Sequence, residues 1–89
     1  MINENHDLVL FYLDRRPDSG RALAIARREA GRRRDVQTLD RLAWALFKNG
    51  RTRAAARLSK AILRTGAPDP LIARHAAQIR ADRSTANAR

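Results

Sequence analysis

The sequence repeats itself at a spacing of 33 residues. Without gaps, this shift superposes three mainly apolar positions of successive copies: Val9 on Leu42 on His75, Leu10 on Ala43 on Ala76, and Leu13 on Leu46 on Ile79. A small residue recurs in the helices paired with these positions: Ala22 superposes on Ala55. A period of this length accommodates two short helices with their turns. The repeat therefore predicts antiparallel helix hairpins that stack on one another.

The local sequence also favours helices throughout. Only three prolines and four glycines occur, and apolar residues recur at steps of three and four. The expected helices, about five in number, run from Asp7 to Arg16, from Arg21 to Arg33, from a cap at Asp35 to Asn49-Gly50, from Thr52 to Thr65, and from Asp69-Pro70 to Asp82. We expect an all-α fold with one domain over residues 1–82 and a disordered C-terminal tail over 83–89.

The middle copy carries a recognisable motif. It reads LAWAL from Leu42 to Leu46, then aromatic-Lys-x-Gly-Arg from Phe47 to Arg51, and Gly66 and His75-Ala76 follow. This pattern resembles the bacterial tetratricopeptide repeat (TPR) over about residues 6–82. It departs from the family where Leu39 replaces the usual Trp and Ser59 a large aromatic residue. The resemblance implies a TPR-like α-solenoid that serves as a protein–protein interaction module.

Stacked hairpins place the first helix of each pair on an inner, concave wall, which binds partners in repeat proteins. The residues expected on that wall are Asp7, Phe11, Asp40, Arg41, Trp44, Phe47, Lys48 and Arg74. Two aromatic residues among charged ones favour binding of a peptide or partner helix, and the cations favour an acidic one. The alternative interpretation of Trp44 is that it packs in the core or is covered by a second copy.

Positive charge is the other conspicuous property. Lys plus Arg outnumber Asp plus Glu by 19 to 9, although the abundance of arginine and alanine is also what a GC-rich genome produces by codon bias. The second helices carry much of this charge on the outer, convex face, and the expected anion-binding stripe consists of Arg53, Arg57, Lys60 and Arg64. A basic nucleic-acid-associating protein is therefore the alternative function. Self-association is a third, because the core is thin.

Residues for catalysis are scarce. The chain has no cysteine, and its two histidines, His6 and His75, lie far apart in the repeat. We expect His75 to be a packed or hydrogen-bonded helix residue. With no phosphate-binding glycine loop and no metal-ligand spacing, the sequence predicts neither an enzyme nor a cofactor. A polar N-terminus and the absence of a long apolar run predict a cytoplasmic protein without a membrane span.

Overall fold

The residues described by the structure, a computed structural model, form helices and no strand. They are residues 8–15, 18–66 and 69–87. Five helices follow one another along them: η1 (Phe11–Arg15), which is a π-helix preceded by one α-helical turn at 8–10, α2 (Ser19–Arg32), α3 (Val36–Lys48), α4 (Thr52–Leu63) and α5 (Pro70–Asn87). The all-α fold predicted from the sequence is confirmed.

Aspartate side chains begin three of these helices. Asp18 Oδ1 accepts from Arg21 N at 3.1 Å at the start of α2. Asp35 Oδ1 accepts from Thr38 N at 2.9 Å at the start of α3. Asp69 Oδ1 accepts from Leu71 N at 2.9 Å before α5. Each bond satisfies a backbone donor that has no partner within the helix, so the caps predicted at Asp35 and Asp69 are confirmed.

The turn after α3 depends on a glycine. Gly50 has a φ of 79°, a conformation that favours glycine. Arg51 N donates to Leu46 O at 2.9 Å and Gly50 N donates to Phe47 O at 3.0 Å, which is the hydrogen-bond pattern of a Schellman motif. The Asn49 side chain donates to Ser19 O at 2.8 Å and so joins the end of α3 to the start of α2.

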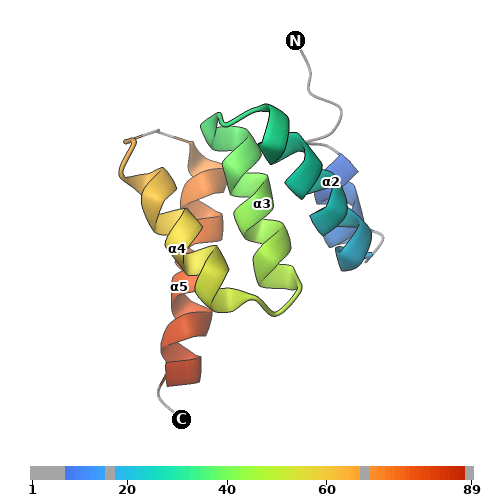
Figure 1. The fold of residues 1–89 in the computed structure, drawn as a ribbon. Coiled ribbons are helices and arrows are strands. Elements are labelled where there is room, and N and C mark those ends of the chain that lie inside the picture. Colours follow the sequence, from blue (N-terminus) through green and yellow to red (C-terminus); the bar gives the residue numbers. More distant parts are fainter. Residues whose placement is uncertain (1–7, 16–17, 67–68, 88–89) are drawn as a thin grey trace.

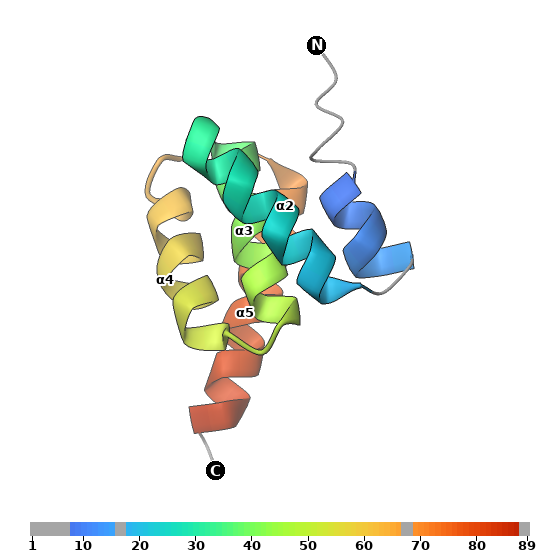
Figure 2. The same ribbon diagram turned by 45° about the vertical axis from the view of Figure 1, so that its right-hand side comes forward.

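The helices pack in chain order. In Figures 1 and 2, α3 lies between α2 on one side and α4 with α5 on the other. α2 packs against η1 and α3, and α5 packs against both α4 and α3. The core follows the 33-residue register in part. The equivalent residues Leu13, Leu46 and Ile79 are all buried, whereas Leu10 and Leu42 are half-buried.

α5 is longer than predicted. It continues to Asn87, five residues beyond the predicted end of the ordered domain at Asp82. No glycine or proline occurs between Asp82 and Asn87, so nothing in this segment breaks a helix. Among the described residues, no helix is both long enough and apolar enough to span a bilayer.

Candidate functional site

Trp44, the expected anchor of the concave wall, is packed instead. Only 8% of its surface is exposed. Its indole stacks on the His75 ring, with centroids 4.1 Å apart and planes inclined by 9°. Phe47 stacks on it at 5.2 Å, and Lys48 Nζ lies 4.8 Å from the ring centre. The prediction that this indole faces solvent is wrong, because α5 packs against α3 and brings His75 over it.

Asp40 is buried in the same place. It is 2% exposed, and its Oδ2 accepts from His75 Nδ1 and from Arg41 Nη1, each at 2.8 Å. A buried carboxylate requires such partners, since an unpaired charge in the interior is costly. The expectation that His75 is a packed, hydrogen-bonded residue is confirmed. Asp40 and Trp44 therefore belong to the packing between α3 and α5 rather than to a docking surface.

The remaining residues of the expected wall do not complete it. Phe11, Lys48 and Arg74 are exposed, but Phe11 contacts Tyr12 edge-on at 5.4 Å. Phe47 and Arg41 are half-buried, and Asp7 lies outside the described residues. Neither of the two hollows described below is lined by any of these residues.

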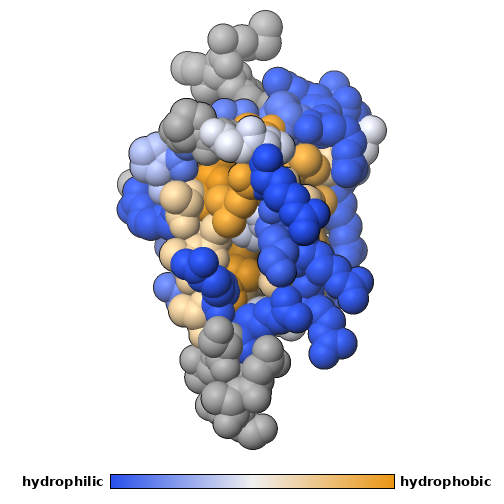
Figure 3. All heavy atoms as spheres, turned by 90° about the vertical axis from the view of Figure 1, so that its left-hand side faces the viewer, coloured by the Kyte–Doolittle hydropathy of each residue, from blue (hydrophilic) through white to orange (hydrophobic). Residues whose placement is uncertain are grey.

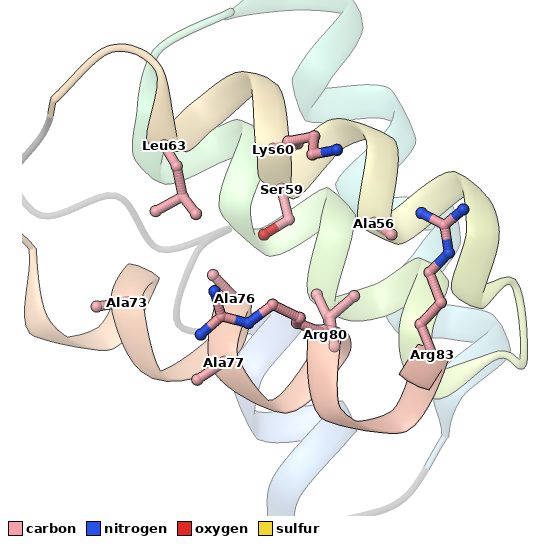
Figure 4. Close-up of a pocket in the computed structure, with 10 residues that line it drawn as sticks. Ala56, Ser59, Lys60, Leu63, Ala73, Ala76, Ala77, Arg80 and Arg83 are labelled. Atoms are coloured by element: carbon pink, nitrogen blue, oxygen red, sulfur yellow. The ribbon is translucent and has the colours of Figure 1, made fainter. Parts of the chain in front are cut away.

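An apolar hollow lies between α4 and α5. Its volume is about 430 Å³. Figure 3 shows the side of the molecule that carries both helices, where an apolar patch is bordered by hydrophilic residues. The apolar lining consists of Ala56, Leu63, Ala73, Ala76, Ala77 and Ile79. Figure 4 shows Leu63 and Ser59 pointing from α4 toward α5. We call this hollow the α4–α5 groove.

Cations border the α4–α5 groove on both helices. Lys60 comes from α4, and Arg80 and Arg83 come from α5 (Figure 4). All three are exposed, and none forms an ion pair with another residue in the part of the chain that the structure describes. The groove therefore combines an apolar floor with a positive rim.

The repeat shows that this groove corresponds to a position that is covered one copy earlier. By the 33-residue shift, Leu63 corresponds to Ala30, and Ala77 to Trp44. Ala30 is 3% exposed and Trp44 8%, whereas Leu63 is 48% exposed and Ala77 is also exposed. Around α3, the following hairpin of α4 and α5 provides the cover. No described helix provides it for α5.

The α4–α5 groove was not among the surfaces predicted from the sequence. Alanines give no chemical signal, and Ala73, Ala77 and Arg80 are prominent only as the residues in register with Asp40, Trp44 and Phe47. The available signal was the repeat itself, because a hairpin follows α3 and none follows α5 within the described residues. Because α4 and α5 pack over α3 and no described helix follows α5, the repeat indicates an uncovered face on α5.

The other candidate surfaces are basic as well. A second hollow is lined by Leu8, Ala24 and Ile25 with Arg21, Arg28 and Arg32. The predicted anion-binding residues Arg53, Arg57, Lys60 and Arg64 are all exposed, and their spacing places them on one side of α4. Lys60 belongs to this stripe and also to the rim of the α4–α5 groove.

Metal-binding chemistry and relatives add no further site. The described residues contain no group of three or more His, Cys, Asp or Glu arranged to hold a metal ion. No protein-family model matches the chain, and no curated protein or solved structure matches it either.

Proposed function

We propose that this chain is a non-catalytic protein-interaction module that docks a partner helix in the α4–α5 groove. The observation that supports this proposal is the contrast in exposure between equivalent positions of the repeat. Ala30 is buried on α2, which packs against α3, and Trp44 is buried where α5 packs against α3, whereas Leu63 and Ala77 lie open. A leucine that is 48% exposed beside four alanines forms a surface that a helix can cover.

This proposal keeps the function expected from the TPR resemblance but moves the docking surface. The inner wall lacks an exposed aromatic anchor near α3, since Trp44 stacks with His75. Hot spots of binding cluster in well-packed pockets from which water is excluded. Among the described surfaces, the α4–α5 groove fits that description better than the scattered Phe11, Lys48 and Arg74.

Nucleic-acid association remains the second candidate. The observation that favours it is the exposed stripe of Arg53, Arg57, Lys60 and Arg64, whose spacing matches one side of a helix. Such a stripe binds phosphates without sequence preference, and its affinity falls steeply with salt. Sequence-independent binding of single strands also uses stacking on exposed aromatic rings. The described part of α4 offers none, because its sequence contains no aromatic residue.

An unbiased selection tests the docking function. A displayed library of helical peptides, randomised without bias in charge, is selected against the full chain, and the site of each binder is mapped by NMR chemical shifts. We expect the shifts to centre on Leu63, Ala73 and Ala77. Leu63→Asn should weaken binding about tenfold, because it places a polar group in the apolar contact.

Leu8→Asn is the matched control, because Leu8 is also an exposed leucine, at 42%, but lines the second hollow. It should leave the affinity unchanged. Binders that map to another face, equal losses in the two variants, or a selection that yields no helical binder each argue against the proposed function.

A further inference from the structure

The rim of the α4–α5 groove restricts the charge of the partner. Lys60, Arg80 and Arg83 stand around the apolar floor, and the lining contributes no carboxylate. α4 itself contains no acidic residue. A docked helix with lysine or arginine beside its apolar face meets three like charges as water leaves the contact, and like charges brought together cost binding energy. Aspartate or glutamate at the same positions is attracted.

The floor of the groove restricts the size of the partner's apolar side chains. α5 contributes the small residues Ala73, Ala76 and Ala77, and the hollow between the helices measures about 430 Å³. One repeat earlier, Trp44 fills the position of Ala77 and Phe47 that of Arg80. Since the described residues supply little volume here, a close-packed contact requires large side chains from the partner.

A second copy of this chain fits the groove poorly. The second hollow, whose apolar lining is Leu8, Ala24 and Ile25, is bordered by Arg21, Arg28 and Arg32. Joining two such patches head to tail places two sets of cations together on chains with a formal net charge of +10 each. Self-association through the groove is therefore opposed by charge.

From these three observations we infer that the α4–α5 groove takes an acidic amphipathic helix, with large apolar residues on one face and Asp or Glu along both edges of that face. This inference depends on the proposed function, because it specifies the partner of the same groove. Unlike the proposed function, it predicts that the groove binds acidic helices more tightly than basic ones.

Two synthetic peptides test it. Both are 18-residue amphipathic helices with the same leucine face, and they differ only in that the edges of this face carry Glu in one and Lys in the other. Each is labelled with a fluorophore and titrated with the full chain at low and at high salt. We expect the Glu peptide to bind about tenfold more tightly at low salt, as three exposed ion pairs allow, and the preference to shrink as salt screens them.

Variants of equal charge locate the effect. Lys60→Gln, Arg80→Gln and Arg83→Gln together should abolish the preference. The matched control is Arg27→Gln, Arg28→Gln and Arg32→Gln, which removes the same charge from α2, on the other side of α3 (Figure 1). This control should keep the preference, and circular dichroism confirms that both triple variants fold.

Each other outcome overturns the inference. If both peptides bind the groove equally, the acidic partner is wrong and the docking function stands; if neither binds there, both fail. A preference lost equally in the control triple reflects net charge alone. A mixed-sequence oligonucleotide is also tested as a competitor. If it displaces the Glu peptide, and Leu63→Asn does not change the affinity for the oligonucleotide, the groove is not the main binding site and nucleic acid is the partner. If light scattering shows that the wild-type chain is a dimer and the Leu63→Asn variant a monomer, a second copy of the chain occupies the groove.

Discussion

At the scale of single residues, Trp44 shows how a long-range contact decides between two interpretations of one pattern. The spacing along α3 fits both an exposed wall and a buried layer. His75 lies 35 residues from Asp40 in the sequence, and its bond to that carboxylate places its ring flat against the indole. An aromatic stack and a charged hydrogen bond then stabilise the same junction. The local sequence of α3 contains no sign of this contact.

Trp44→Ala should therefore reduce stability rather than remove a ligand anchor. We expect a loss of about 3–5 kcal/mol in the free energy of unfolding, as for other large aromatic residues truncated in a core. Trp44→Phe should cost much less, because it keeps an aromatic ring and because the indole Nε1 has no hydrogen-bond acceptor among the described residues. Urea unfolding followed by circular dichroism measures both. A Trp44→Ala protein with the wild-type midpoint would show that the indole is not part of the core.

At the scale of elements, helix boundaries were predictable wherever a local signal sets them. Asp35, Asp69 and Gly50 act within a few residues of their own positions, so the sequence alone indicated these ends. The end of α5 was missed because no capping residue marks it. The α4–α5 groove was missed for another reason: its floor is alanine, whose exposure depends on which helix packs above it. Capping residues and turn glycines can therefore be identified from one sequence, whereas the exposure of a helix face depends on how all the helices pack.

Two glycines offer a matched test of this distinction. Gly50→Ala places a Cβ on a backbone with a φ of 79° and should destabilise the protein by about 1–2 kcal/mol. Gly31→Ala lies within α2, where a Cβ meets nothing within 4 Å, and should stabilise it by about 0.5–1 kcal/mol. Thermal unfolding compares the pair. Equal effects of one sign would contradict the assignment of Gly50 to the Schellman turn.

At the scale of the whole molecule, positive charge is concentrated on surfaces that the fold leaves uncovered. Both hollows carry three cations each, and the stripe on α4 places Arg53, Arg57 and Lys60 at spacings of four and three, where like charges repel. The buried acids Asp40 and Glu29 lie elsewhere and do not compensate for this. An arrangement of this kind lowers the stability of the isolated chain through self-repulsion.

The last prediction follows from that self-repulsion. Raising NaCl from low to about half molar should stabilise the isolated chain, because ions screen the repulsion between its cations, and the midpoint of thermal unfolding should rise by about 4 °C or more. Arg57→Glu should raise the midpoint at low salt, since the new carboxylate lies four residues after Arg53 and three before Lys60. At high salt this gain should shrink. A wild-type midpoint that falls with added salt would mean that attractive exposed pairs such as Arg33–Asp35 outweigh the repulsion. The excess positive charge would then not destabilise the isolated chain.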